Sequence, residues 1–244
     1  MTNFWESKKS AKQWSKYYQN ISEKTYPNET IIRLFKGSFL SDMFTNFTEK
    51  KYRNKKILEV SCGVGQNFSF YKDLGLRAYG TEVHSVITQI LKKRYPYSTF
   101  KVGTNLRLPF PDNTFDFLVS WAAIHYVEKE NLYRKCLEEH KRVLKKNGRI
   151  IIGTAGPHHR TRLKEKKISK FIFKMTAEDS KKTGYSSTTK IDPRKGKLFF
   201  FFSKIKDIKS FYSRYFVSVK VGRIKHQLLS ITNDYYLITG KKGR

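Results

Sequence analysis

Residues 57–67 read ILEVSCGVGQN, an apolar run followed by a turn with two glycines and the polar start of a helix. We interpret the apolar run as a buried strand. In an open α/β sheet, ligands bind where such strands end. Gly63 and Gly65 remove side chains where the backbone must bend and approach a ligand closely, and the next helix presents free N–H groups there. The stretch therefore predicts a ligand-binding loop.

A carboxylate further along the chain supports this interpretation. Glu82 lies 17 positions after Gly65, at the end of the next predicted strand. Near this spacing a carboxylate accepts hydrogen bonds from ribose hydroxyls; the alternative is a glutamate exposed at a strand end. The two glycines alone are weak evidence, because NAD and flavin sites share them and simple turns produce them by chance. The strand, the helix and Glu82 together favour a nucleotide-type ligand.

Strands and helices alternate around this loop. Predicted strands cover residues 55–60, 76–83, 99–104, 115–124 and 148–155, and predicted helices cover 67–74, 85–94 and 129–144. Such alternation implies right-handed crossovers and a parallel sheet. Later residues predict a strand at 197–202, a helix at 205–216 and an antiparallel pair of strands at 217–226 and 233–242. We expect an α/β, Rossmann-like fold with a seven-stranded, mostly parallel sheet and helices on both faces.

Two regions fall outside the alternation. Residues 1–50 predict an N-terminal helical cap, with an aromatic helix over 4–22 and a second helix capped by Asn28. Residues 51–244 are then the main domain. Within it, an insertion at about 158–198 follows the fifth strand, is strongly basic and lacks a clean period. It is either a mobile, solvated insertion or a lid or partner-binding segment over the site.

The charge of the chain is strongly unbalanced. Among 244 residues there are 50 Lys and Arg against 20 Asp and Glu, a formal net charge of +30. This favours an anionic partner, such as a phosphorylated substrate, an anionic membrane surface or RNA. A compositional bias toward Lys, Asn, Ile, Phe and Tyr would produce the same excess without any partner. Both interpretations stay open.

Cysteine content and apolar runs indicate the compartment. The two cysteines, Cys62 and Cys136, suit a reducing cytoplasm and predict neither a disulfide framework nor a metal site. The start, MTNFWESKKSAKQW, is polar, which argues against a signal peptide. No apolar run approaches the ~18 residues that span a bilayer. We expect a cytoplasmic protein, or one that is peripheral at the inner membrane surface; no pattern indicates an oligomeric state.

Four motifs follow in order over roughly residues 55–155: ILEVSCGVGQN, YGTEV, LPFPDNTFDFLVSWAAIHYV and VLKKNGRIIIG. Together they resemble the class I S-adenosylmethionine-dependent methyltransferases, specifically the type 11-like small-molecule group. The three-glycine dinucleotide pattern is not met, since Asn67 and Phe68 follow Gly65, and this argues against NAD. The resemblance implies S-adenosyl-L-methionine as the cofactor, with Gly63 and Gly65 letting the backbone meet its methionine moiety.

The resemblance also assigns cofactor roles to single residues. Glu59 would contact the amino-acid end of the cofactor, Glu82 the ribose and Val83 the adenine. Thr104 stands where the family often has Asp, so the adenine contact passes to Asn105, a backbone group or water. The implied cofactor-binding set is Glu59, Ser61, Gly63, Gly65, Asn67, Glu82, Val83, Thr104, Asn105, Leu106, Ser120 and Trp121.

Methyl transfer needs mainly proximity and orientation, and a base only where an acceptor hydroxyl must lose its proton. His125 is the candidate catalytic base, with a packing role or no role as the alternatives. Four residues are candidates for binding the acceptor. For Trp14 and Tyr18 the alternative is a helix that packs over the cofactor pocket, and for His158 it is a basic loop. The fourth candidate, Tyr126, follows His125 directly.

The acceptor is indicated by weaker signals. Residues 120–125 read SWAAIH, which replaces the [DNS]-P-P-[YF] motif of enzymes that methylate exocyclic base nitrogens. The fragments FW, WSKYY and YPNE near the start resemble uncharacterised bacterial methyltransferases that occur with surface-polysaccharide biosynthesis. This implies O-methylation of a small-molecule or sugar/glycan-type acceptor. The alternatives are a methyltransferase of RNA or another macromolecule and a non-enzymatic binding protein, which the intact Gly63, Gly65 and Glu82 disfavour.

Overall fold

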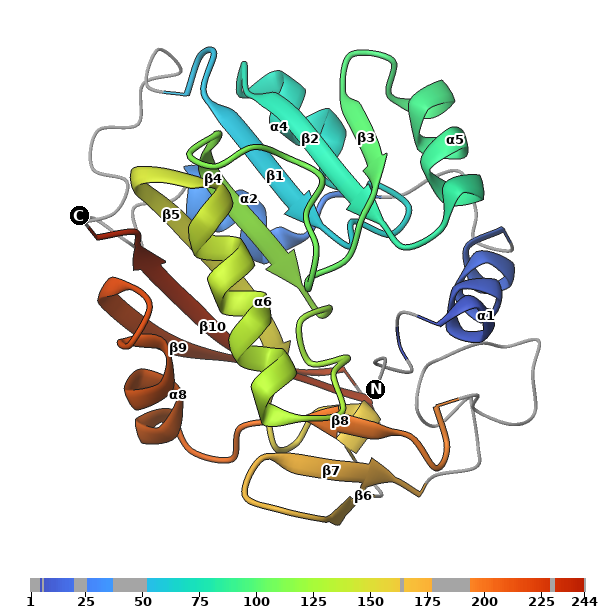
Figure 1. Cartoon of the computed structure of the whole chain (residues 1–244), viewed down its shortest axis with the longest axis vertical. Helices are drawn as coiled ribbons and strands as arrows, with labels where there is room; N and C mark the ends of the chain where they lie inside the picture. Colours follow the sequence, from blue (N-terminus) through green and yellow to red (C-terminus); the bar gives the residue numbers. More distant parts are fainter. Residues whose placement is uncertain are drawn as a thin grey trace.

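The computed structural model describes residues 5, 7–19, 26–36, 52–162, 165–176, 194–228 and 231–243. Over these ranges, seven strands form one sheet in the order β3-β2-β1-β4-β5-β10-β9. They are β1 (Lys56–Val60), β2 (Arg77–Glu82), β3 (Thr99–Val102), β4 (Phe115–Trp121), β5 (Leu144–Ala155), β9 (Val217–Leu228) and β10 (Ile231–Lys241). Strand β10 pairs antiparallel with both β5 and β9, and the other neighbouring strands pair parallel. The predicted mostly parallel sheet is confirmed (Figure 1).

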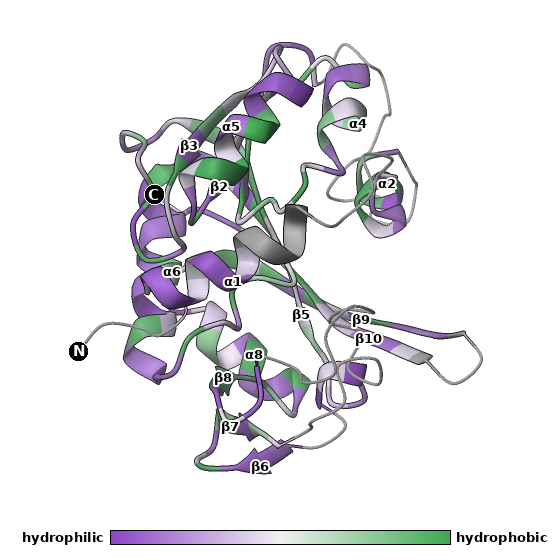
Figure 2. Cartoon of the chain, turned by 90° about the vertical axis from the view of Figure 1, so that its right-hand side faces the viewer, coloured by the Kyte–Doolittle hydropathy of each residue, from purple (hydrophilic) through white to green (hydrophobic). Residues whose placement is uncertain are grey.

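Helices cover both faces of the sheet because neighbouring strand residues point to opposite sides. In β1, Ile57 and Leu58 belong to different core clusters. The cluster of Ile57 includes side chains from α2 (Glu29–Lys36), α4 (Phe68–Asp73) and α5 (Ser85–Arg94). The cluster of Leu58 includes side chains from α6 (Glu130–Val143) and α8 (Ile205–Tyr212). Figure 2 shows α2 and α4 on one side of the sheet and α6 on the other.

The two N-terminal helices lie in different places. The predicted cap at Asn28 is confirmed, since its Oδ1 accepts hydrogen bonds from the N–H groups of Thr30 at 2.9 Å and Ile31 at 3.3 Å. Helix α2 then buries Ile31, Leu34 and Phe35 against the sheet, which stabilises the fold by about 1.5–3 kcal/mol for each side chain. Helix α1 (Lys8–Gln19) is separate and packs Trp14 on Tyr126. The stretch 37–51 lies outside the described residues.

The described part of the insertion forms a second, small sheet. Strands β6 (Glu165–Lys167), β7 (Ile172–Met175) and β8 (Leu198–Phe200) pair antiparallel in the order β6-β7-β8. Phe200 stacks on Tyr133 of α6 at 4.1 Å, and its N–H donates to the carbonyl of His125 at 3.1 Å. Within the insertion itself, Phe171 and Ile172 are buried in the same core cluster as Phe200, so a wholly solvated insertion is wrong for the stretch around β7. Residues 177–193 lie outside the described ranges.

Several boundaries differ from those predicted; α8, for example, ends at Tyr212 instead of residue 216. Helix α6 ends at Val143, and β5 begins directly at Leu144 instead of at residue 148. The chain bends inside this longer strand, where Asn147 adopts a φ of 63° before Gly148.

In the described part of the chain, none of the helices has both the length and the apolar character needed to cross a bilayer.

Candidate functional site

The site lies at the edge of the sheet where β1, β2, β4 and β5 end, which we call the carboxyl edge. Glu82, the last residue of β2, is 3% exposed, so an exposed glutamate at this strand end is wrong. Its carboxylate accepts the N–H of Gly63 at 2.5 Å and that of Val83 at 3.2 Å. The end of β2 therefore holds the glycine loop, which runs from Ser61 to Asn67.

A second buried carboxyl group, Glu59, lies beneath this loop. Its Oε1 accepts a hydrogen bond from the side-chain amide of Asn67 at 2.9 Å. The Oδ1 of Asn67 in turn accepts the N–H of Asn28 at 2.8 Å. Asn67 thus connects the end of β1 to the first turn of α2. The resemblance implied Asn67 as a cofactor-binding residue, which stays a prediction; the connection to Asn28, 39 residues away, depends on tertiary structure.

The glycines of the loop serve the chain itself as well as any ligand. Ser61, Gly63 and Gly65 have φ values of 53°, 58° and 75°, in the left-handed region that favours glycine. A Cβ on Gly65 would lie 2.6 Å from the ring of Tyr95 and 2.8 Å from Leu91 of α5. Gly65 is therefore required by helix packing, a role that the resemblance did not indicate.

The ends of β1 and β4 meet in a buried polar cluster around Asn105. Its Oδ1 accepts the hydroxyl of Ser120 at 3.4 Å and contacts Nε2 of His140 at 3.0 Å, while its Nδ2 donates to the hydroxyl of Ser61 at 3.3 Å. Burial lowers the pKa of His140 to about 3, so the ring is neutral and its Nε2–H is the donor. Asn105 therefore joins the loop after β1, the end of β4 and helix α6. Its contact with adenine stays a prediction.

The Thr104 hydroxyl is used within its own turn. Its Oγ1 accepts the N–H groups of Leu106 and Arg107, both at 3.2 Å. A hydroxyl at this position thus shapes the 104–107 turn beside the end of β3. The roles of Val83, Thr104 and Leu106 at the adenine stay predictions, and the structure places all three within one edge of the sheet.

His125 lies in a closed aromatic setting beyond the end of β4. It is 5% exposed, stacks on Tyr126 at 4.7 Å and places Nδ1 3.3 Å from the hydroxyl of Thr154. Burial lowers the pKa of His125 well below its usual value, and the neighbouring His159 and Arg194 lower it further. His125 is therefore neutral at physiological pH, and the same burial and positive charges disfavour its protonated form.

Aromatic side chains of the cap and of β10 meet around this position. Trp14 of α1 contacts Tyr126 edge-on at 5.3 Å. Trp121, at the end of β4, contacts Tyr235 of β10 at 5.4 Å. Gly153 makes room for that indole, since a Cβ there would lie 2.4 Å from Trp121. Of the predicted acceptor-binding residues, Trp14 and Tyr126 thus come together, while the side chain of Tyr18 lies outside the described residues.

The two histidines after β5 behave differently from each other. His158, the predicted one, is exposed and contributes its backbone N–H to Asp234 at 2.8 Å. His159 is 5% exposed and touches the ring of Tyr235 at 4.6 Å. Sequence alone could not separate the neighbours, because the turn that buries one of them is fixed by Asp234, 76 residues away.

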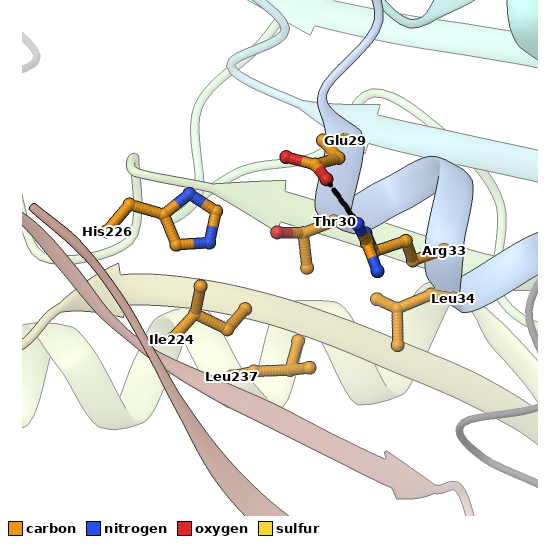
Figure 3. A pocket seen from close by; sticks show the side chains of 7 residues that line it. All are labelled: Glu29, Thr30, Arg33, Leu34, Ile224, His226 and Leu237. Carbon is orange, nitrogen blue, oxygen red and sulfur yellow. Dashed lines mark hydrogen bonds and ion pairs between the residues drawn. The ribbon is translucent and has the colours of Figure 1, made fainter. Parts of the chain in front are cut away.

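A cavity lies between α2 and the β9–β10 hairpin (Figure 3). Its volume is about 370 Å³, and its apolar lining comes from Leu34, Ile224 and Leu237. Glu29 and Arg33 form an exposed ion pair at its rim. Leu237 lies two residues from Tyr235, so this cavity neighbours the aromatic groups of the carboxyl edge. Among the described residues, no group of three or more His, Cys, Asp or Glu side chains is arranged to hold a metal ion.

Comparison with known proteins agrees with this geometry. Residues 58–152 match the family described as a methyltransferase domain. An uncharacterized protein of Methanocaldococcus jannaschii is 30% identical over 140 residues, which cover 56% of this chain and 58% of the relative. A demethylmenaquinone methyltransferase of Paenarthrobacter aurescens is 33% identical over 99 residues, 40% of this chain and 38% of the relative. The chain thus aligns with less than two thirds of either relative.

A solved structure shares the fold. It is the 1,6-didemethyltoxoflavin-N1-methyltransferase of Burkholderia thailandensis, with bound 1,6-didemethyltoxoflavin and S-adenosylhomocysteine. The TM-score is 0.57 at 14% sequence identity, and the match covers 79% of this chain and 72% of that one. This likeness shows the fold. The stretch that matches the methyltransferase domain, residues 58–152, contains the glycine loop and both Glu59 and Glu82. Residues 58–152 therefore match a methyltransferase domain in sequence, and most of the chain shares the fold of a solved methyltransferase.

Proposed function

We propose that this protein transfers a methyl group from S-adenosylmethionine to a small-molecule acceptor. The observation that carries the proposal is the pair of buried carboxyl groups, Glu59 and Glu82, on either side of the glycine loop. Glu59 is buried, and besides Asn67 the hydroxyl of Tyr71 is the described group that stabilises its charged form. A buried carboxyl group with so little compensation fits a ligand that brings an ammonium group, and Glu82 fits its ribose hydroxyls.

The cofactor, when bound, supplies a methyl group on a positively charged sulfur. The protein's own contribution is then to bind, to orient and to exclude water. Glu82 and Asn67 fix the loop, and Trp121 and Tyr126 form an aromatic wall beyond the end of β4. Calorimetric titration with S-adenosylmethionine tests the proposal directly. Absence of binding at millimolar cofactor would contradict it.

Cofactor affinity is expected to depend on pH through the two carboxyl groups. Burial raises the pKa of Glu59 and of Glu82 to about 7, from the usual 4.5. Below pH 7 both are largely protonated and lose their attraction for a cation. Affinity for S-adenosylmethionine should therefore rise between about pH 6 and 8, by up to about tenfold per unit for each carboxyl that must ionise. Calorimetry across this range measures the slope.

The same groups set the stability of the free protein. Between pH 4.5 and 7 the folded state holds protons that the unfolded chain has released. The free energy of unfolding therefore falls as pH rises through this window and levels off above it. Glu59→Gln and Glu82→Gln should each flatten both pH dependences, because an amide does not titrate there. An unchanged slope in both variants would contradict this assignment.

For the acceptor, we propose O-methylation of a sugar or glycan-type hydroxyl. The support is the resemblance of the N-terminal fragments together with a neutral, buried His125 at the carboxyl edge. The acceptor can be identified by comparing metabolites and surface glycans with and without the protein, searching for a mass difference of one methyl group. RNA is the second candidate acceptor, and the net charge of +30 favours it. Finding methylated RNA in the same comparison would establish it.

We further propose a cytoplasmic protein, free or peripheral at the inner membrane surface.

His125 is expected to act as the base if the acceptor is a hydroxyl. Replacing it by alanine should then lower turnover about 10²–10⁴-fold, with cofactor affinity unchanged. Because its pKa lies well below the usual value, the wild-type rate should not fall near pH 6.5. Thr154→Val is the companion variant, since it removes the hydroxyl beside Nδ1 and keeps the shape. A change in turnover below threefold for His125→Ala would leave it a packing role.

A further inference from the structure

His159, in the turn after β5, has one ring nitrogen that is hydrogen-bonded and one that is not. Nδ1 accepts hydrogen bonds from the hydroxyl of Thr161 at 2.7 Å and from its backbone N–H at 3.2 Å. Because Nδ1 accepts from a backbone N–H, the ring proton lies on Nε2. That Nε2–H is buried, and it has no partner among the described residues. Leaving a buried donor without a partner is costly, so a ligand that accepts a hydrogen bond from it would bind more tightly.

Two arginines accompany this donor. Arg160 is partly buried, and its Nε is enclosed without a hydrogen-bond partner in the described part of the chain. Arg194, from the other end of the insertion, is 5% exposed. Burial, together with these two arginines, lowers the pKa of His159 to about 3. Both also lower the pKa of Tyr235, which burial raises to about 12. The four side chains therefore form one electropositive group.

The carboxylates nearby are already engaged. Asp234 is fully buried, and it accepts the Nε and Nη2 groups of Arg223 at 2.8 Å each. It also accepts the backbone N–H of His158 at 2.8 Å. Glu165 receives both Nε and Nη2 of Arg162. Each of these two acids is thus paired with an arginine of its own; Asp234 still raises the pKa of His159, but Arg160 and Arg194 each lower it more.

Ring contacts connect His159 to the carboxyl edge of the sheet. The ring of His159 touches Tyr235 at 4.6 Å, and Tyr235 touches Trp121 at 5.4 Å. Trp121 directly follows Ser120, which is hydrogen-bonded into the polar cluster below the glycine loop. One aromatic ring therefore separates the end of β4 from the unpartnered donors.

We propose that the methyl acceptor carries a phosphate or carboxylate group, held by Nε2–H of His159 and Nε–H of Arg160 while Arg194 adds positive charge. This inference rests on the proposed function, since it concerns the acceptor of the same site. A phosphate or carboxylate offers several oxygen acceptors and a negative charge, which match two N–H donors and two guanidinium groups. The described ends of the insertion would then act in acceptor binding, with Trp121 and Tyr235 flanking the rest of the molecule.

The test uses small aromatic anions as probes, because the wall of the site is aromatic. The full-length protein is titrated calorimetrically with phenyl phosphate and with benzoate at fixed ionic strength, and with benzyl alcohol as the neutral ring. His159→Asn keeps an acceptor for Thr161 and removes the Nε2 donor, whereas His159→Gln restores a donor at that distance. Arg160→Gln removes the guanidinium at a partly exposed position. Arg214→Gln, an exposed arginine near α8, is the matched control.

We expect His159→Asn and Arg160→Gln each to weaken binding of at least one anion about tenfold or more. Arg214→Gln and His159→Gln should stay within about threefold of the wild type, and benzyl alcohol should not distinguish the variants. Comparing phenyl phosphate with benzoate shows which anion the site prefers. Equal anion affinities in all variants would overturn the inference and assign binding to the general positive charge. Because S-adenosylmethionine is titrated separately, its failure to bind the wild type would instead count against the proposed function.

Discussion

Gly65→Ala is expected to destabilise the protein by about 2–5 kcal/mol. Two costs add at this position: a left-handed φ of 75°, which costs a side chain about 1–2 kcal/mol, and a Cβ 2.6 Å from Tyr95 and 2.8 Å from Leu91, which costs about 1–3 kcal/mol. Because α5 would be pushed away from the loop, cofactor affinity should fall as well. Urea denaturation measures the loss of stability.

The chain offers a matched control for the backbone cost. Gly196 has the same φ of 75°, but nothing lies within 4 Å of a Cβ built there. Gly196→Ala should therefore cost only about 1–2 kcal/mol. Adding Tyr95→Ala to Gly65→Ala should return part of the loss as a coupling energy of about 0.5–3 kcal/mol. If Gly65→Ala were no worse than Gly196→Ala, helix packing would not be the reason for this glycine.

Glu82→Ala is expected to weaken S-adenosylmethionine binding at least about 100-fold, because hydrogen bonds to a charged group contribute about 1.5–3 kcal/mol each. The carboxylate serves the loop as well as the ligand, so its loss also leaves the N–H of Gly63 without its acceptor. Calorimetry measures the affinity. Asp73→Ala, which removes an exposed acid at the end of α4, should leave the affinity unchanged.

Glu82→Gln separates charge from shape. The amide oxygen can still accept from Gly63, so the loop should keep its conformation while the charge is lost. Burial of the carboxylate raises its pKa to about 7, which means that its ionised form is costly in the free protein. At pH 8 the Gln variant should therefore be at least as stable as the wild type and yet bind the cofactor more weakly. A variant that binds normally would remove the charge of Glu82 from cofactor recognition.

The spacing of apolar residues in the sequence was sufficient to predict the helices and strands of the main sheet. Helix α5 spans the predicted residues 85–94, and Asn28 caps α2 as expected. The strands at 217–228 and 231–241 close the sheet antiparallel, as predicted. These features depend on hydrophobic spacing and on local capping, both of which are present in a short stretch of sequence. The same reasoning identified Glu82, since it marks the end of a strand.

Side-chain roles at the site required the fold. Asn67 bonds both Glu59 and Asn28, and Asn105 joins the ends of β1 and β4 to α6. Apart from the bond between Asn67 and Glu59, which spans eight residues, these contacts join residues 15 to 44 positions apart, so no local pattern encodes them. Sequence could not show that His158 is exposed and His159 buried, because both follow β5 in the same basic stretch and the turn is held by Asp234 of β10; the role of His158 in acceptor binding stays a prediction.

The sequence by itself determined the order of strands and helices, the glycine loop and the two carboxylates beside it, because these follow from local apolar spacing and turn chemistry. Only the tertiary structure decided what packs against that loop. It required Gly65 because α5 lies against it, and it brought His159 and Arg160 toward Trp121 through Tyr235. The tertiary structure also decided the pKa values of the two carboxyl groups. Burial raises the pKa of Glu59 and of Glu82 to about 7, and no single stretch of sequence specifies burial.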